Sequence, residues 1–375
     1  MSLDTIRVQP GAANYFSYEG ALEQIERFHP AATLKRVLWI GGPRALAAAK
    51  PYLPALYADP RSIHAVFSGH CSESTVAGYV REGLAADLVI GVGGGSALDT
   101  AKAVAHRLGK PFIAIPTIAA TCAAWTPLSV WYDDEGRALR FELFPSASQL
   151  VLVEPRILLA APADYLRAGI GDTLAKWYEA RVLCDAEPSL PLTAQLGLSV
   201  ARQIHDILLA EGPAALDAIA RGKANPSFLP VVDAIIAGGG LVGGLGERFT
   251  RLAAAHSIHN GLTVLPETGR FLHGAKVAYG ILVQLALEGR HDELRRLHAA
   301  LATLGLPRRL GELGIELAPG EPINAFIAHT LRAGESIHFL PCAVDASRLR
   351  HALETVETLG NPTLQVATPE TALAA

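Results

Sequence analysis

Residues 88–105, LVIGVGGGSALDTAKAVA, constrain the fold more than any other stretch of this chain. A run of β-forming residues at 88–92 precedes three consecutive glycines, and apolar residues recur at helical spacing from Ser96. This pattern predicts a strand, a tight turn and the start of a helix. Glycine lets the backbone come close to a ligand, and the first N–H groups of a helix carry partial positive charge, so the junction suits a pyrophosphate. The sequence therefore predicts a nucleotide-binding turn, with a purely structural turn as the alternative because the G-x-G-x-x-G spacing is only approximate.

Strand and helix patterns alternate on both sides of this turn. We expect an edge strand before about residue 16 that includes Ile6–Val8, and the other expected elements are strands at 36–40, 64–67 and 111–116 and helices at 21–28, 46–52 and 73–82. This β-α-β-α order predicts a parallel, Rossmann-like sheet with helices on both faces. Ligands of such sheets bind at the carboxyl ends of the strands.

The pattern changes near Pro162, where strand signals stop and long helical patterns begin. The expected helices cover 172–183, 191–209, 233–244, 251–260 and 276–288, with further helices to Leu359 and a disordered tail after Gly360. We therefore predict an α/β nucleotide-binding domain over residues 1–161 and an all-α domain for metal and substrate over residues 162–375.

Composition narrows the functional class. A chain of 375 residues accommodates two domains, and its net charge of -4 without a long block of one sign argues against nucleic-acid and membrane-surface partners. Its four cysteines form no C-x-x-C pair, which indicates reduced thiols in the cytoplasm. We expect no apolar run long enough to span a bilayer.

Four polar residues at helix ends suggest a metal site. Asp172 follows a glycine, and taken alone it is typical of a helix N-cap. His256 and His259 share one helix face, and His273 begins another helix after a short loop. A single histidine is usually a satisfied polar residue, but several beside small residues favour a site. One carboxylate with two imidazoles is a common ligand set for Zn²⁺ or Fe²⁺.

Several motifs together resemble one family. The segments GVGGGSALDTAKA, PTIAATCAAWTPLSVWY, GIGDTLAKWYEA and AAAHSIHNG…HGAKVAYG resemble, in order, motifs of the glycerol dehydrogenase branch of the iron-containing, metal-dependent alcohol dehydrogenases. The match runs from about Arg7 to Leu359. Within it, TCAAWTPLSVWY, DTLAKWYEA and GGLGERFTR are similar to the hydroxycarboxylate dehydrogenase type, which reduces 2-oxo acids with NADPH. The resemblance implies a dehydroquinate synthase-like fold and a homo-oligomer.

The resemblance also implies roles for individual residues. It makes Asp172, His256 and His273 the metal ligands, facing the substrate, and it places His259 near the substrate as a proton relay. The predicted cofactor site consists of Gly42, Arg44, Gly93, Gly94, Gly95, Ser96, Asp99, Thr117, Ala120, Thr126, Leu128 and Tyr132. In this set Ala120 and Thr126 stand where the relatives have serine.

A charge difference bears on the substrate. Glycerol dehydrogenases have a substrate-facing Asp where this chain has Cys122, and the thiol removes a charge that would repel an anionic 2-oxo acid. The related polyol enzymes have small or neutral residues in place of Lys176 and Arg251. We predict that one or both bind the substrate carboxylate, while solvated helix charges are the alternative. Trp125 and Trp131 are expected either to wall the substrate pocket or to pack in the core.

The second strand of the sheet bears on the cofactor. NAD enzymes usually have an acidic side chain there, which would repel a 2′-phosphate. This chain has Gly41-Gly42-Pro43-Arg44 at that place, so we expect Arg44 to favour NADPH over NADH.

These inferences converge on a metal-dependent oxidoreductase. We expect it to transfer hydride between NAD(P)H and a 2-oxo acid or 2-hydroxycarboxylate, such as 2-oxoglutarate or 2-oxobutanoate, with a divalent metal that polarises the carbonyl. Zn²⁺ or Fe²⁺ is expected, and Ni²⁺ and Mn²⁺ also suit the ligands. The alternatives are an NAD-dependent glycerol dehydrogenase, a lyase of the dehydroquinate synthase type, and a binding or sensor protein without turnover. The lyase needs extra basic residues around a phosphate, which do not cluster in this sequence.

Overall fold

A computed structural model describes residues 7–317 and 320–359 of the chain. It divides into two compact units, Met1–Arg251 and Leu252–Ala375, and each is described by itself. The change from strands to helices near Pro162 falls inside the first unit, at the start of its long helices. The predicted functional division at 161/162 therefore stays a prediction. The tail after Gly360 lies outside the described residues.

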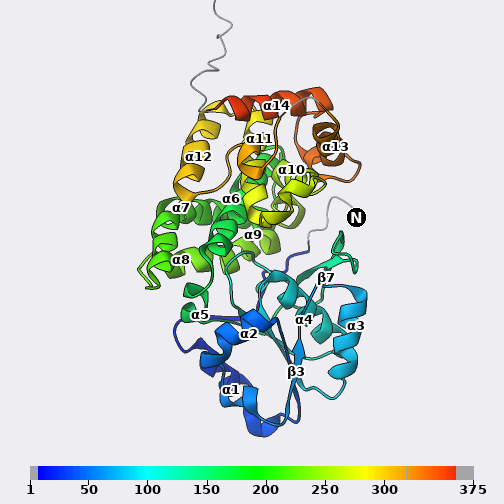
Figure 1. Cartoon of the computed structure of the whole chain (residues 1–375), viewed down its shortest axis with the longest axis vertical. Helices are drawn as coiled ribbons and strands as arrows, with labels where there is room; N and C mark the ends of the chain where they lie inside the picture. Colours follow the sequence, from blue (N-terminus) through cyan, green and yellow to red (C-terminus); the bar gives the residue numbers. More distant parts are fainter. Residues whose placement is uncertain (1–6, 318–319, 360–375) are drawn as a thin grey trace, which may run out of the picture. The chain divides into compact units, whose positions relative to one another are not determined.

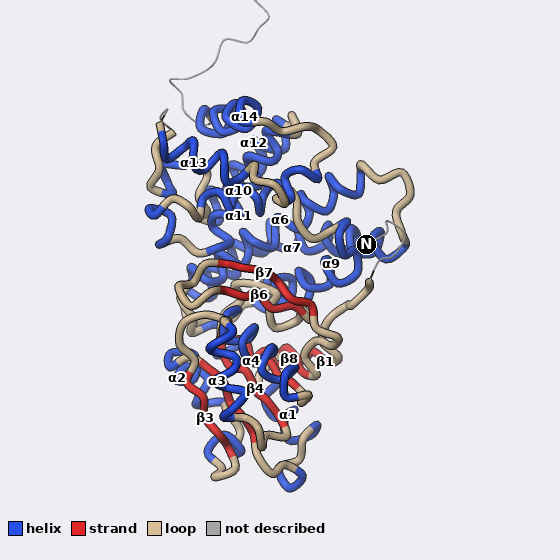
Figure 2. The backbone as a smooth tube through the Cα atoms, turned by 90° about the vertical axis from the view of Figure 1, so that its right-hand side faces the viewer, coloured by secondary structure: helices blue, strands red, loops and turns tan. Residues whose placement is uncertain are grey.

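The first unit is built on a six-stranded sheet in which every pairing is parallel. Figure 2 shows its strands in red. In sheet order they are β1 (Asn14–Ser17), β8 (Leu150–Val153), β5 (Phe112–Pro116), β4 (Leu88–Gly93), β2 (Val37–Gly41) and β3 (Ser62–Val66). The central strands are buried along their whole length, as apolar strands covered on both faces must be. The predicted parallel α/β fold is confirmed.

The sheet register brings the carboxyl ends of three strands to one edge. Gly41 of β2 lies opposite Val92 of β4, and Gly93 lies opposite Pro116 of β5. The Thr117 N–H donates to the Gly93 carbonyl at 3.1 Å. The segments that follow these three strands are therefore neighbours, as ligand binding at a parallel sheet requires.

The helices α1 (Gln24–Phe28), α2 (Pro43–Ala49), α3 (Glu73–Glu82) and α4 (Gly95–Leu108) accompany the sheet, with α5 (Pro155–Leu159) after its last strand (Figure 1). Helix α4 packs unusually close to β4. A Cβ on Gly91 would lie 2.8 Å from the Ala101 Cβ, and one on Gly93 would lie 2.8 Å from the Ala97 Cβ. Two glycines of the turn motif thus have a packing role of their own.

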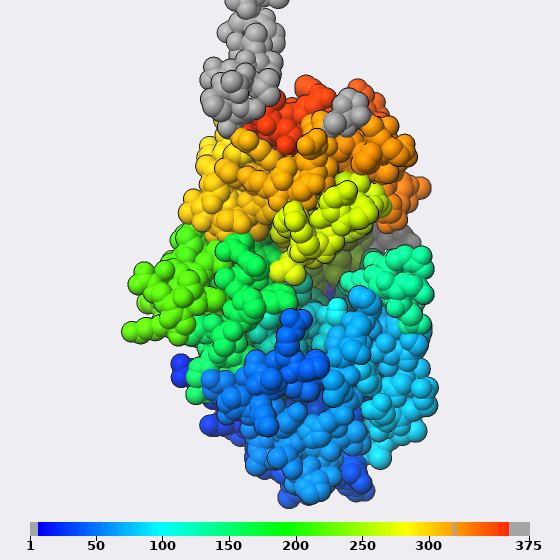
Figure 3. Space-filling model, viewed as in Figure 1, coloured from blue at the N-terminus to red at the C-terminus, as the bar shows by residue number. Residues whose placement is uncertain are grey.

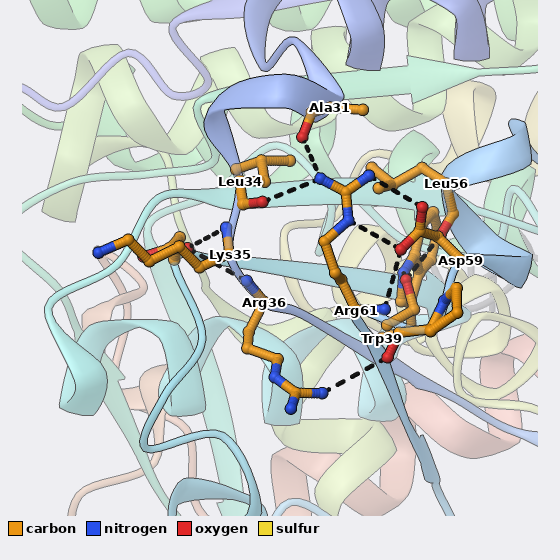
Figure 4. Close-up of polar contacts among 11 residues, drawn as sticks. Ala31, Leu34, Lys35, Arg36, Trp39, Leu56, Asp59 and Arg61 are labelled. Carbon is orange, nitrogen blue, oxygen red and sulfur yellow. Dashed lines mark hydrogen bonds and ion pairs between the residues drawn. The ribbon is translucent and has the colours of Figure 1, made fainter.

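A half-exposed arginine network lies at the amino ends of β2 and β3 (Figure 4). The Arg61 guanidinium pairs with both carboxylate oxygens of Asp59 at 2.8 Å. It also donates to the carbonyls of Ala31 and Leu34. These bonds tie the segment before β2 to the segment before β3.

The structure corrects two strand predictions. The edge strand β1 forms at Asn14–Ser17, after the Pro10-Gly11 turn, whereas Arg7 and Val8 are not in a strand and Ile6 lies outside the described residues. The antiparallel pair β6 (Leu128–Tyr132) and β7 (Ala138–Leu143) and the strand β8 were not predicted. The strand β7 could not be recognised in the sequence. Its residues are mostly exposed, so it lacks the apolar alternation of a strand with one face on a core.

Long helices complete the first unit. They are α6 (Ala163–Asp185), α7 (Leu192–Arg221), α8 (Phe228–Asp233), a π-helical turn (Ala234–Gly238) and α9 (Gly239–Gly246). Asp172 lies in the middle of α6, so its interpretation as an N-cap is wrong. Residues Phe228–Phe249 have the length and mean hydropathy (1.8) of a membrane-spanning helix, which corrects our expectation that no run is long enough. Because 56% of that apolar window is buried inside the protein, the run has the character of a core helix.

The described residues of the second unit contain helices and no strand. The main ones are α10 (Ala254–Leu262), α11 (His273–Leu287), α12 (His291–Leu304), α13 (Glu321–Thr330) and α14 (Ala346–Thr358). Helix α11 is the centre of the unit, since α10, α12 and α14 all pack on it. Figure 3 shows the surface of this unit in yellow to red. The prediction of an all-helical C-terminal region is confirmed for the part of the chain that is described.

Candidate active site

The glycine turn forms a narrow backbone cradle at the start of α4. Gly94 occupies the N-cap position, and within the described residues no side chain caps the helix. A Cβ on Gly94 would lie 2.6 Å from the Ile118 Cδ1, and one on Gly95 would lie 3.3 Å from the Thr121 Oγ1. Only glycine fits this space without displacing its neighbours. The helix N-terminus with Ser96 in its first turn therefore has the form that a pyrophosphate site needs.

The other predicted cofactor residues lie on two segments of the same unit. Gly42 is the N-cap of α2, and Arg44 is exposed in the first turn of that helix. Thr117 follows β5 and is buried. The half-buried residues Ala120, Thr126, Leu128 and Tyr132 continue through the loop into β6. The structure thus carries the predicted groove residues on the carboxyl side of the sheet.

Asp99 has a different environment from that of a cofactor ligand. Its carboxylate lies 3.2 Å from the Lys102 Nζ and accepts from the Val130 N–H at 3.1 Å. Lys102 also donates to the carbonyls of Ala123, at 2.8 Å, and Leu128. Burial raises the pKa of the Asp99 carboxyl, and Lys102 opposes that rise. The pair therefore anchors the loop after β5 to α4, and sequence reasoning missed Lys102 because a lysine in a helix normally points to solvent.

Cys122 lies against a glycine-rich face of α9. A Cβ on Gly239 would lie 3.7 Å from the Cys122 Cβ, and one on Gly243, one turn later, would lie 3.5 Å from the Arg251 Cγ. The two glycines therefore let the thiol and the guanidinium side chain approach the same helix face. The π-helical turn that precedes α9 is a feature found often at functional sites.

Charged groups surround Cys122. Burial raises the pKa of its thiol, Lys176 lowers it, and Asp172 adds to the rise. Burial lowers the pKa of Arg251, and Glu247 and Cys122 oppose that shift. Lys176, Asp172 and Arg251 are thus all electrostatic neighbours of one thiol within the first unit. The structure brings together the predicted substrate residues of this unit.

Arg251 lies in the segment between α9 and α10, because α10 begins at Ala254. Our expectation that it heads that helix is wrong. Its Nε is buried and has no hydrogen-bond partner among the described residues. Glu247, in the same segment, has a φ of 49°, the one positive value found for a described residue other than glycine. An orphaned buried donor beside a strained turn is a feature of ligand sites. No sequence signal pointed to Glu247.

The histidines of the second unit form a connected pair. The His273 Nδ1 lies 2.9 Å from the His259 Nε2, and the His256 ring lies 5.6 Å from the His273 ring, centroid to centroid. His259 is buried, whereas His256 is half-buried and His273 is exposed. Burial lowers the pKa of His259 well below its ordinary value, and His273 and Lys276 lower it further.

The second ring nitrogen of His259 is also occupied. Its Nδ1 lies 3.0 Å from the Asn260 Oδ1, and the Asn260 Nδ2 donates to Glu335 at 2.9 Å. Arg332 pairs with the same glutamate at 2.7 Å. Sequence reasoning did not select Asn260, Glu335 or Arg332, since the last two are far from the histidines in the chain.

The donor set fits a divalent metal ion. Asp172 offers a carboxylate that is 6% exposed, in the first unit. His256 and His273 offer two neighbouring imidazoles in the second unit. Two imidazoles and one carboxylate suit Zn²⁺ or Fe²⁺ and leave positions for substrate.

The two tryptophans pack as structural residues. Trp131 is 1% exposed and lies between the guanidinium groups of Arg107 and Arg140. The Trp125 Nε1 donates to the Pro10 carbonyl at 2.6 Å, and its ring contacts Tyr15 edge-on. The alternative of core packing is the one that these contacts support.

A parallel sheet with a glycine cradle and a unit that carries paired histidines are the features of a metal-dependent dehydrogenase. Comparisons with known proteins agree. The family description "Iron-containing alcohol dehydrogenase" matches residues 12–155. The chain is 55% identical to hydroxycarboxylate dehydrogenase A of Escherichia coli K12 over 359 residues, which are 96% of this chain and 99% of that protein.

Glycerol dehydrogenases are more distant relatives. The enzyme of Thermotoga maritima is 37% identical over 303 residues, 79% of this chain and 81% of that protein. The crystal structure of glycerol dehydrogenase from Schizosaccharomyces pombe is similar with a TM-score of 0.84 and 28% identity, covering 95% of this chain and 91% of that one. The chain belongs to the iron-containing alcohol dehydrogenase family, whose members are metal-dependent, nicotinamide-dependent oxidoreductases of small molecules.

Proposed function

We propose that this enzyme reduces a 2-oxo acid to the 2-hydroxycarboxylate with NADPH. The observation that carries the proposal is the placement of Lys176 and Arg251 around Cys122. Two cations beside a neutral thiol attract an anionic substrate, whereas a carboxylate at residue 122 would repel it. The printed name of the 55% identical relative, a hydroxycarboxylate dehydrogenase, supports the same substrate class.

Arg251 is the residue we assign to the substrate carboxylate. Arg251 is half-buried at the glycine face of α9, and its buried Nε–H has no hydrogen-bond acceptor among the described residues. A planar guanidinium binds a carboxylate through two parallel hydrogen bonds, which fixes the orientation of the substrate. Lys176 adds a second positive charge. Cys122 brings no negative charge to this place.

Asp172, His256 and His273 are the residues we assign to one divalent metal ion. The ion, when bound, is a Lewis acid that polarises the carbonyl of the substrate. Asp172 is held in a buried turn of α6, and the two imidazoles are held by the N-terminal turn of α11 and by α10. Zn²⁺ or Fe²⁺ suits this ligand set best, and Ni²⁺ or Mn²⁺ is compatible with it. We expect the metal-bound form to be the active one.

The glycine cradle is the part of the chain that we assign to the cofactor. Gly94, Gly95 and Ser96 present the helix N-terminus to the pyrophosphate. Arg44 is exposed at the start of α2, after the strand whose end carries the ribose ligand in related folds. Its charge supports NADPH over NADH. Asp99 takes part indirectly, by holding the loop with Lys102.

An NAD-dependent glycerol dehydrogenase is the second candidate, since several relatives carry that name. A kinetic screen separates the two. The purified enzyme is assayed with a series of 2-oxo acids and with glycerol and other polyols, each with NADP(H) and NAD(H). We expect the highest kcat/KM for a 2-oxo acid with NADPH. A higher kcat/KM for glycerol with NAD would overturn the proposal.

The carboxylate assignment has a test of its own. Lys176→Ala and Arg251→Ala are compared on a 2-oxo acid and on an uncharged ketone of similar size, with the exposed Arg202→Ala on α7 as a control. Loss of a charge-assisted hydrogen bond of about 1.5–3 kcal/mol predicts a fall in kcat/KM of roughly tenfold or more for the 2-oxo acid. The ketone should be affected much less. Equal losses on both substrates would reject the role.

We also propose that the enzyme works in the cytoplasm. All four cysteines are free thiols in the structure, which supports a reducing compartment. The homo-oligomer implied by the resemblance stays a prediction, which the mass of the native protein in solution will decide.

A further inference from the structure

We infer that His259 is a positioning residue that fixes the tautomer and the orientation of His273, through a hydrogen-bonded chain that starts at Glu335. The inference rests on the proposed metal site, because it explains how one of the proposed ligands is prepared for the ion. It replaces the proton relay that the resemblance suggested for His259.

The direction of each hydrogen bond in this series follows from the Glu335 carboxylate, with which the series begins. Arg332 pairs with the Glu335 carboxylate, which accepts hydrogen bonds. The Asn260 Nδ2, 2.9 Å away, therefore donates to it, so the Asn260 Oδ1 faces His259. An amide oxygen can only accept, which places the His259 proton on Nδ1, at 3.0 Å from that oxygen.

The same logic then fixes His273. The His273 Nδ1 faces the His259 Nε2 at 2.9 Å, so a metal ion can bind His273 only through Nε2, and the His273 Nδ1–H then donates to the His259 Nε2. The proton of His273 therefore lies on Nδ1, and its lone pair lies on Nε2. A metal ion binds the nitrogen with the lone pair, so the chain selects Nε2 as the ligand atom.

Two features argue against a proton relay at His259. Its neighbour on the Nδ1 side is the amide of Asn260, which cannot take up a proton and release another as a carboxylate or imidazole does. Its ring is also buried, at 9% exposure, within α10. Neutral groups that hold a metal-binding imidazole in place are a common second layer around metal sites, and their loss weakens metal binding about 10- to 100-fold.

The test compares two replacements of His259 in the full-length protein. Glutamine places its side-chain oxygen near the position of Nε2 and can accept from the His273 Nδ1, whereas leucine cannot. The metal-free proteins are titrated with Zn²⁺ in competition with a coloured chelator. We expect His259→Leu to bind Zn²⁺ about 10- to 100-fold more weakly than the wild type, and His259→Gln to bind within about threefold of it.

Activity at saturating Zn²⁺ gives the second readout. A positioning role predicts that His259→Gln keeps a kcat near that of the wild type, with the same pH profile. A relay role predicts that glutamine and leucine lose kcat alike, and that result would overturn the inference. His298→Leu, which replaces another buried histidine on α12, is the matched control and should keep the wild-type affinity.

Two further results distinguish failure of the proposed function from failure of the inference about His259. If the wild type itself binds no Zn²⁺, Fe²⁺, Ni²⁺ or Mn²⁺, the proposed function fails, independently of His259. If the wild type binds Zn²⁺ and His259→Leu binds it equally well, the metal site stands and the inference fails. Should His259→Leu not fold, Asn260→Leu removes the acceptor one step away and should weaken Zn²⁺ binding in the same range; unchanged binding by that variant would also overturn the inference.

Discussion

The Lys102 ammonium lies 3.2 Å from the Asp99 carboxylate, and both side chains are buried. The lysine also donates to carbonyls at Ala123 and Leu128, so a single residue of α4 holds the middle of the loop after β5 and the start of β6. Asp99 and Lys102 therefore help to fix the loop that carries several of the residues we assign to the cofactor.

Replacing Lys102 should destabilise the protein strongly. In Lys102→Met the Asp99 carboxylate stays buried without its partner, which typically costs about 3–5 kcal/mol of unfolding free energy. Urea unfolding measures that loss, and the exposed Lys50→Met on the first unit should change stability by no more than about 0.5 kcal/mol. The double variant Asp99→Asn/Lys102→Met should recover part of the loss. A Lys102→Met protein as stable as the wild type would show that the pair has no structural role.

Restoring a carboxylate at residue 122 should change the substrate preference. Cys122→Asp places a negative charge beside the site to which we assign the substrate carboxylate, so kcat/KM for a 2-oxo acid should fall by roughly tenfold or more. The ratio of glycerol to 2-oxo acid activity should rise. The neutral isostere Cys122→Asn separates charge from shape and should lose much less. A Cys122→Asp enzyme with the wild-type preference would contradict the electrostatic account.

Arg44 should decide between the two nicotinamide cofactors. Arg44→Ala removes an exposed charge at the start of α2, and loss of a charge-assisted bond to the 2′-phosphate of about 1.5–3 kcal/mol should raise the KM for NADPH roughly tenfold or more. The KM for NADH should be unchanged, because NADH has no such phosphate. Arg27→Ala, which removes another exposed arginine of the same unit, serves as the control. Parallel changes for both cofactors would argue against this role.

Glu357 should make stability depend on pH. Its carboxylate accepts from the Leu310 N–H at 2.9 Å and from the Tyr279 hydroxyl at 3.1 Å, and burial raises its pKa above the ordinary 4.5. An acid whose pKa is raised in the folded state keeps its proton after the unfolded chain has lost it. Stability from this group is therefore complete below pH 4.5 and falls as the pH rises through the raised pKa.

The variant Glu357→Gln removes that titration. Between pH 4 and 7 its unfolding free energy should fall less than that of the wild type, by at most about 1.4 kcal/mol for each unit of pKa shift. Glu354→Gln changes an exposed glutamate of the same helix and should keep the wild-type pH slope. Equal slopes in the wild type and Glu357→Gln would contradict the assignment.

The fold of the first unit was predictable where strands are buried on both faces. The continuous apolar runs of β2, β4 and β5 are distinctive, and the glycines after β4 mark the turn. The bounds of the edge strand and the β6–β7 pair were not predictable, because their residues are half exposed or exposed and have no clean alternation. Asp172 misled local reasoning since a glycine before an aspartate suggests a helix start, whereas α6 tolerates Gly169 and Gly171 in its interior.

The candidate functional residues of the site were easier to predict than the residues that hold them in place. Spacing pointed to the histidines, and the difference in charge from the related polyol enzymes pointed to Lys176 and Arg251. The residues that hold them were missed, because Lys102, Asn260 and Glu335 act through contacts between segments that are distant in the chain. A single sequence carries no signal for such contacts.

The central claim is that a metal ion held by Asp172, His256 and His273 is required for reduction of a 2-oxo acid. The most direct measurement is NADPH oxidation with a 2-oxo acid, made on the enzyme as purified, after removal of metal with a chelator, and after addition of Zn²⁺ or Fe²⁺. We predict that activity is lost on chelation and returns with metal in the wild type, and that Asp172→Asn regains little of it. Activity that survives complete metal removal would contradict the account.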